Sequence, residues 1–338
     1  MSMQPEPTTI ADDATPSVRV GAPLTRLIRL QALPVLTATI LLFLVAAVVA
    51  PRIFTSASMV AIVIPASVLA IAGIGQTLVI QQKGIDLSVP GMMTLSAVLT
   101  AVLTANGVPF VVGLLVGIGV GVLGGIVNAF IVTRLHITPL LVTLATNYLF
   151  IGLVWTTSGG AARNAPNELV GIAGASWLGF PVIGWIAIVL LVVVAVVMSA
   201  TSFGRRFTGA GASPLAARAA GTLIDRHIAL GYIASSVAAS LAGLLLAGYA
   251  GQVTYDIGTP YQLTVIAAVV VGGAALAGGR GSVIATGLGA LLLTVVVQMI
   301  LTLGAPQSVQ LLAQAVVFGL AAMARLLPWG RVRRARTT

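Results

Sequence analysis

The chain contains 338 residues, of which 58% are hydrophobic and only 7% charged, whereas roughly a quarter of the residues of a soluble domain are charged. This composition is that of an integral membrane protein, with no room for a second globular domain. Cysteine is absent, and His136 and His227 lie outside any HExxH pattern, so thiolate, iron–sulfur and zinc catalysis lack ligands. We therefore expect no metal site and no cofactor. The net charge of +10 is better explained by membrane topology than by nucleic-acid binding.

The first 32 residues are polar and contain several prolines and arginines, which predicts a disordered cytoplasmic tail. The apolar run that follows could belong to a signal peptide. However, Pro51 and Arg52 lead directly into another apolar run, and no Ala-x-Ala-like site followed by a soluble domain is present. We therefore predict a first helix that is retained in the membrane.

A transmembrane domain is predicted over residues 33–327, because apolar runs follow one another there. They predict an all-α polytopic fold of about ten transmembrane helices, with broken or re-entrant segments. Gly113, Gly117, Gly121 and Gly125 recur at every fourth position and predict close helix packing. The apolar runs cover residues 33–50, 58–82, 91–105, 108–133, 138–158, 181–200, 228–249, 262–277, 283–304 and 308–327.

The distribution of basic residues predicts the orientation of these helices. If the N-terminus is cytoplasmic, all of the 17 lysines and arginines except Arg52 and Arg163 fall on the cytoplasmic side, including those of a basic tail at 328–338. If the short segment 91–105 did not cross, the later basic clusters would lie outside. Charge thus favours ten crossings with both termini in the cytoplasm.

The first unusual motif is Gly84–Gly91, which places Asp86, Ser88 and Pro90 between two apolar runs. A carboxylate near bilayer depth is costly unless it is paired or hydrated, and it commonly marks a pathway. Proline and the flanking glycines favour a broken helix, which is tolerated where protein or a water cavity satisfies the backbone. An ordinary hydrated cytoplasmic turn is the alternative.

A second glycine-rich motif, Gly272–Val283, contains Arg280 between two later apolar runs. Its place in the alternation of spans matches that of Asp86, so the two segments are candidates for repeat-related equivalents. We hypothesise that Asp86 and Arg280 lie near the cytoplasmic exit, as an ion pair or within one polar network. The alternative is that Arg280 is only a positive-inside residue.

The longest predicted cytoplasmic loop is 201–227. Ser213 can cap a short helix with Pro214 in its first turn, and Gly221 is a suitable stop. Such a helix at the cytoplasmic face suits docking into a groove on a partner, although a simple connector is the alternative. Its predicted residues are Ser213, Pro214, Leu215, Ala216, Ala217, Arg218 and Gly221.

Polar residues inside the predicted spans can hydrogen-bond a solute, although bonding between helices is their commoner use. Aromatic residues make up only 5% of the chain, which favours a weak transit site over a tight carbohydrate site. The pathway or gate candidates are Asp86, Ser88, Asn128, Asn147, Arg280 and Gln298, and the other polar residues of the spans are Gln76, Thr143, Thr146, Tyr148, Ser235, Ser236 and Gln314.

Together, Gly84–Val89 with the following Met92–Ala97, the loop Gly204–Gly221 and the stretch Gly272–Gly289 resemble the membrane permease of ribose-type ABC sugar importers. The similarity keeps the same order over about residues 58–325. The sequence departs from that pattern at Pro90, where glycine is usual, and at other positions that bear on substrate more than on family: Gln82, Lys83, Ala212 and Ser213.

The resemblance implies a homodimeric or heterodimeric permease of the bacterial inner membrane that receives solute from a periplasmic or lipid-anchored sugar-binding protein. It implies a separate ATP-binding cassette ATPase subunit, for which Ser213–Gly221 is the coupling helix. Independently, the only lysine, Lys83, precedes Gly84 and Ile85, so the chain lacks the GxxxxGK[ST] pattern of a nucleotide-binding P-loop. We expect a transport subunit without ATPase activity of its own, which moves a monosaccharide by alternating access.

Two other functions are alternatives for a chain of this composition. An ion-coupled secondary transporter would normally use midplane carboxylates, and Asp86 is the only candidate, since Glu168, Asp225 and Asp256 fall in predicted loops. A membrane enzyme lacks any Ser/His/Asp, Ser/Lys or metal constellation. Within the ABC permease interpretation, a nucleoside or a furanose-like signal molecule is the alternative cargo.

Overall fold

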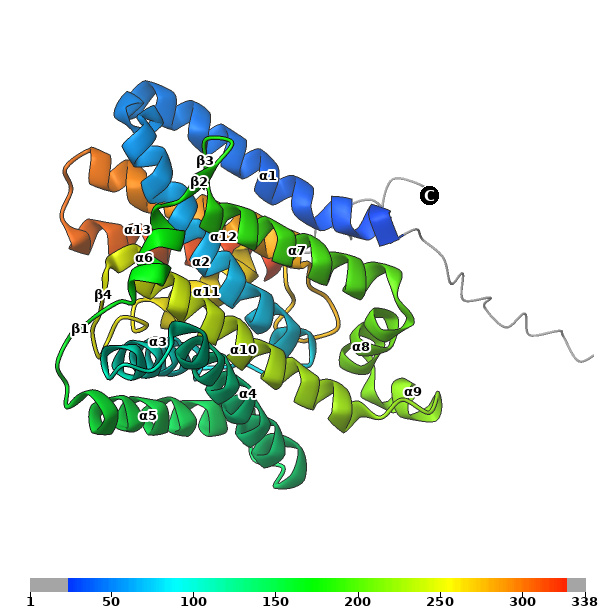
Figure 1. The fold of residues 1–338 in the computed structure, drawn as a ribbon. Coiled ribbons are helices and arrows are strands. Elements are labelled where there is room, and N and C mark those ends of the chain that lie inside the picture. Colours follow the sequence, from blue (N-terminus) through cyan, green and yellow to red (C-terminus); the bar gives the residue numbers. More distant parts are fainter. Residues whose placement is uncertain (1–23, 327–338) are drawn as a thin grey trace, which may run out of the picture.

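The computed structural model describes residues 24–326, which form a bundle of helices (Figure 1). Each of the ten predicted apolar runs coincides with most of one helix. These helices are α1 (Leu24–Val49), α2 (Ser56–Gln81), α3 (Val89–Ala105), α4 (Phe110–Arg134), α5 (Pro139–Ser158), α7 (Val182–Ala200), α10 (Ile224–Ala250), α11 (Tyr261–Val271), α12 (Val283–Thr302) and α13 (Gln307–Leu326).

The described helices confirm an all-α polytopic membrane protein. Seven of them are long and apolar enough to cross a bilayer by length and composition, whereas α3, α11 and the apolar part of α13 are shorter. The apolar run 262–277 predicted a longer α11, but the helix ends at Val271, before Gly272 and Gly273. Its 11 residues extend about 16 Å, roughly half of the hydrocarbon thickness.

The predicted tails lie mostly outside the described residues. The basic tail 328–338 and residues 1–23 of the predicted N-terminal tail belong to this part. The helix α1 begins at Leu24, within the predicted tail 1–32. Leucine and isoleucine recur through residues 24–30, so apolar helix-forming residues extend the first helix toward the N-terminus.

Helices α2 and α10 form the interior of the bundle. Helix α10 contacts α2, α3 and α4, and α2 also contacts α7, α11 and α12. Glycines permit these close approaches: a side chain at Gly75 would meet the Ser235 backbone, and one at Gly243 would meet the Met93 backbone. The helices therefore pack through small residues, as expected where lipid removes the hydrophobic drive for association.

The glycine repeat of α4 forms its buried face. Gly113 and Gly117 lie against Thr100 of α3, whereas Gly121 and Gly125 lie against α10. The opposite face of α4 exposes large apolar residues, and so do α1, α5 and α7. An exposed apolar perimeter, with the buried polar side chains enclosed among the helices, is the arrangement that a lipid environment favours.

Short elements complete the two ends of the bundle. At one end, α6 (Asn167–Gly174) packs against α10, and β1 (Arg163–Asn164) pairs antiparallel with β4 (Gln252–Val253). The hairpin strands β2 (Ser176–Trp177) and β3 (Phe180–Pro181) precede α7, and the 3-10 helix η1 (Pro51–Phe54) joins α1 to α2. At the other end lie α8 (Ser202–Ala212) and α9 (Pro214–Ala219) (Figure 1).

Candidate functional site

The predicted break around Asp86 separates α2 from α3. Residues 82–88 are not helical, and Lys83 has a left-handed backbone with φ of 65°. Pro90 lies in the first turn of α3, where a missing N–H is tolerated. Asp86 is only 2% exposed. The hydrated turn considered as an alternative is therefore wrong, because protein surrounds this segment.

Short-range contacts hold the Asp86 carboxylate. Its Oδ1 accepts hydrogen bonds from the Ser88 N–H at 2.9 Å and from the Ser88 hydroxyl. With its amide oriented to satisfy both groups, Gln76 donates to the Asp86 carbonyl at 3.0 Å and accepts from the Asp86 N–H at 3.3 Å. The helix α2 thus braces the backbone of the break through an internal side chain.

Helices α4 and α5 extend these contacts into an interhelical network. Asn128 Nδ2 donates to Ser88 Oγ at 2.9 Å, and Thr146 Oγ1 donates to Asn128 Oδ1 at 2.7 Å. Asn147 Oδ1 accepts from the Gly91 N–H at 2.9 Å. Because all of these groups are buried, each bond satisfies a group that would be costly to leave unpaired.

A line of buried hydroxyls on α10 faces the same region. Tyr232 lies against Gly84, Ser235 against Gly75, and Ser240 against Gly121. The side-chain oxygens of Tyr232, Ser235, Ser236 and Ser240, together with Asp86 Oδ2, have no hydrogen-bond partner among the described residues. Buried polar atoms of this kind are commonly satisfied by water or by a ligand. The interior therefore offers free hydrogen-bonding capacity beside the break.

Three segments meet at the end of α2. The Gly279 N–H donates to the Gln81 carbonyl at 2.8 Å, and Gln81 Nε2 donates to the Gly281 carbonyl at 2.8 Å. Gln82 Nε2 donates to the Phe207 carbonyl of α8 at 2.8 Å. A side chain at Gly211 of α8 would overlap the Gln81 carbonyl oxygen. We call this contact of α2, α8 and loop 278–281 the α2 junction.

The helix predicted in loop 201–227 is present as α9. Ser213 caps it by accepting from the Ala216 N–H at 3.4 Å, and Pro214 occupies its first turn. Gly221, with φ of 75°, terminates it. Leu215 is 85% exposed. The loop also contains α8, which the sequence analysis did not predict, because glycine has low helix propensity.

The structure brings four of the six pathway candidates together: Asp86, Ser88, Asn128 and Asn147. The other two lie elsewhere, since Arg280 is exposed in the loop of the α2 junction and Gln298 is half-buried on α12. Among the described residues, no ion pair joins Asp86 to Arg280, and the hypothesis of a direct pair is wrong. Ser88 donates to one oxygen of the buried Asp86 carboxylate, whereas Arg280 is exposed at the surface.

The network also contains Gln76 and Thr146, which were recognised as polar residues of the spans but not as members of the site. The sequence feature that could have identified them is a polar side chain, an amide in Gln76 and a hydroxyl in Thr146, within a long apolar run. No group of three or more His, Cys, Asp or Glu residues that could bind a metal exists within the described residues. The cluster can form hydrogen bonds to polar solutes and water.

Comparison with known proteins identifies the family. Residues 58–331 match the family described as branched-chain amino acid transport system / permease component. The autoinducer 2 import system permease protein LsrC of Photorhabdus luminescens is 30% identical over 74% of this chain and 76% of its own length. The L-arabinose transport system permease protein AraH of Escherichia coli K12 is 31% identical over 72% of this chain and 74% of its own length. No solved structure matches the chain.

These matches confirm the resemblance to ribose-type permeases, since each covers most of the chain and the family match spans the region of all three motifs. They also confirm a multi-pass inner-membrane transport component rather than an enzyme. The matched region, the apolar helices and the relatives therefore establish that this chain belongs to the ABC importer permease family.

Proposed function

We propose that this chain is the membrane-spanning subunit through which an ATP-driven importer moves a monosaccharide into the cytoplasm by alternating access. The observation that carries this proposal is α9, an exposed, capped helix joined through α8 to the buried break around Asp86. Such a permease requires a docking helix whose movement can reach the polar residues inside the bundle, and the contact of α8 with the end of α2 supplies this connection.

The proposed topology has ten membrane-embedded helices and both termini in the cytoplasm. The described helices α1–α5, α7 and α10–α13 supply the ten segments, of which α3, α11 and the apolar part of α13 are the short ones. With this topology the α2 junction, α8 and α9 face the cytoplasm, together with the basic residues of loop 201–227. The positive-inside rule supports the same orientation.

The exposed residues of α9 support a docking role. Leu215 and Ala216 are exposed and Ala217 is half-buried, so an apolar and a small side chain face away from the bundle. Small residues allow a helix to enter a groove closely, and an exposed leucine supplies apolar area to bury there. We propose that the occupant of α9 is a separate ATP-binding cassette ATPase subunit.

The proposed cargo is a ribose-like or related monosaccharide, delivered by a periplasmic or lipid-anchored sugar-binding protein. A second copy of the chain or a paralogue completes the permease dimer. The name of AraH supports a pentose cargo. The name of LsrC, an autoinducer 2 import permease, supports a signal molecule as a second candidate cargo.

The docking role is tested with Ala216→Glu and Ala217→Glu in the assembled importer. We expect both variants to lose copurification with the ATP-binding subunit and to lose uptake, because a buried unpaired carboxylate opposes docking. Ala161→Glu, an exposed position at the opposite end of the bundle, is the matched control for copurification. Normal copurification and uptake by both α9 variants would remove this helix from the docking role.

A further inference from the structure

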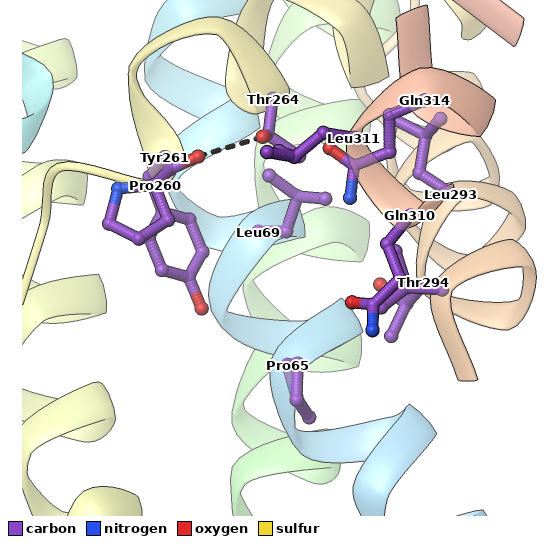
Figure 2. Close-up of a pocket in the computed structure, with 11 residues that line it drawn as sticks. Pro65, Leu69, Pro260, Tyr261, Thr264, Leu293, Thr294, Gln310, Leu311 and Gln314 are labelled. Atoms are coloured by element: carbon purple, nitrogen blue, oxygen red, sulfur yellow. Dashed lines mark hydrogen bonds between the residues drawn. The ribbon is translucent and has the colours of Figure 1, made fainter. Parts of the chain in front are cut away.

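A cavity of about 280 Å³ lies between α2, α11, α12 and α13 (Figure 2). It is far from the α2 junction along the bundle: Leu69, which lines it, precedes Gln81 by 12 residues of continuous helix, or about 18 Å. The cavity therefore lies toward the end of the bundle that is opposite α8 and α9.

Two glutamine side chains supply most of the polar capacity of the cavity. Gln310 and Gln314 are four residues apart on α13, so they share one face of the helix, and both line the cavity (Figure 2). Neither side-chain amide forms a hydrogen bond with another described residue. Each amide offers two donor hydrogens and a carbonyl acceptor, so the pair can both donate to and accept from a solute.

The two threonines of the cavity act differently. Thr264 Oγ1 donates to the Pro260 carbonyl at 2.8 Å, and Thr294 Oγ1 donates to the Ala290 carbonyl at 2.9 Å. Each hydroxyl has therefore committed its hydrogen to its own helix and presents acceptor lone pairs to the cavity. Together with the glutamines, the wall presents donors and acceptors, the combination that hydroxyl groups of a solute can satisfy.

The rest of the wall is apolar and uncharged. Tyr261 contributes an aromatic ring, and aliphatic side chains of α2 and α12 complete the lining. No Asp, Glu, Lys, Arg or His lines this cavity. A charged solute would therefore lose its hydration without gaining a counter-charge, which is strongly unfavourable.

The size of the cavity limits the solute. Its volume of about 280 Å³ is just below the range of roughly 300–1,000 Å³ typical of pockets for drug-sized ligands. A single sugar ring fits this space better than a disaccharide or a nucleotide. An acyl chain would fill the space but would leave both amides without partners, and such groups are costly in an apolar environment.

We propose that this cavity is a transit site for an uncharged, polyhydroxylated solute of the size of one sugar ring, with Gln310 and Gln314 as its main hydrogen-bonding residues. The inference rests on the proposed function, because it makes the cavity the entry half of the same pathway. Exposed hydroxyls would bind the glutamine amides and threonine oxygens, and the C–H face of the ring would lie against the apolar wall.

The natural absence of cysteine allows a direct test on the purified full-length chain. Val297→Cys and Thr294→Cys place single thiols at the cavity, and Gln262→Cys, on α11 but outside the cavity lining, is the matched control. The rate of labelling by a small neutral thiol reagent is measured with and without millimolar D-ribose or L-arabinose, and with ribose 5-phosphate as the charged probe.

We expect at least one of the two neutral sugars to slow labelling of the Val297→Cys and Thr294→Cys variants several-fold. The sugars should not affect the Gln262→Cys variant, and ribose 5-phosphate should not affect any of the variants. A Gln310→Leu substitution added to Thr294→Cys should weaken protection about 5-fold, the loss of one hydrogen bond of about 1 kcal/mol. Labelling that neither sugar changes would overturn the proposal, and so would equal protection by ribose 5-phosphate. Thiols that the reagent cannot label even without sugar, because lipid covers them, would also overturn it. The measurement needs neither ATP nor a partner, so its failure is distinct from failure of ATP-driven uptake.

Discussion

The contact between Gly211 and the Gln81 carbonyl leaves no space for a side chain, which makes Gly211→Ala a direct test of the α2 junction. Alanine is favoured over glycine by about 0.5 to 1 kcal/mol in a helix. Against this, overpacking costs about 1 to 3 kcal/mol. Displacing the Gln81 carbonyl also endangers its 2.8 Å hydrogen bond from Gly279, which contributes about 1 kcal/mol. The net destabilisation of the junction is about 1 to 3 kcal/mol.

The matched control is Gly209→Ala, two residues earlier in α8, where a side chain would meet nothing within 4 Å. This variant should keep full activity and gain slightly in stability. We expect Gly211→Ala to keep copurification with the ATP-binding subunit but to lose about tenfold in uptake, because a shift of 1.4 kcal/mol changes a population tenfold. Uptake per hydrolysed ATP is the readout. Equal coupling in the two variants would show that the junction does not transmit motion.

Three further predictions concern the interior and the energy source. Asn128→Leu removes two hydrogen bonds between segments and should destabilise the purified protein by about 1 to 3 kcal/mol. The control Thr133→Val, whose hydroxyl bonds only within α4, should lower the melting temperature far less. Similar melting temperatures for the two variants would contradict the network. Exchange of the charges by Asp86→Arg with Arg280→Asp should not recover the uptake lost in Asp86→Asn, because Asp86 is buried and Arg280 exposed, and recovery would prove contact. The isolated chain should show no saturable binding of a fluorescent ATP analogue, since the P-loop pattern is missing.

The positions of the helices could be predicted because hydropathy reports the length of chain that a bilayer accepts. The end of α11 could not, because Ala274–Ala277 remains apolar after the helix has stopped at Val271. Two glycines end it, and hydropathy carries no information about that backbone change. Helix α8 was missed for the opposite reason, since Gly204 and Gly211 lower its propensity but are required by tight backbone contacts.

Part of the site was predictable from chemistry alone, because buried carboxylates and amides are rare in apolar spans. Asp86, Asn128 and Asn147 are predictable in this way, and Ser88 belongs to the same motif as Asp86. Their pairing was not predictable, since the bond from Asn128 to Ser88 joins residues 40 positions apart and depends on how α4 packs. The cavity could not be predicted either, because it depends on how α2 packs against α11, α12 and α13, which are far from it in the sequence.

The central claim is that ATP hydrolysis on a separate subunit drives a sugar through this chain. The most direct measurement is the initial rate of labelled D-ribose and L-arabinose uptake by vesicles that contain the chain, its ATP-binding subunit and the sugar-loaded binding protein. The account predicts uptake of at least one of these sugars that requires ATP on the side of α9 and persists when ionophores abolish proton and sodium gradients. Uptake that collapses with an ion gradient and proceeds without ATP would contradict it.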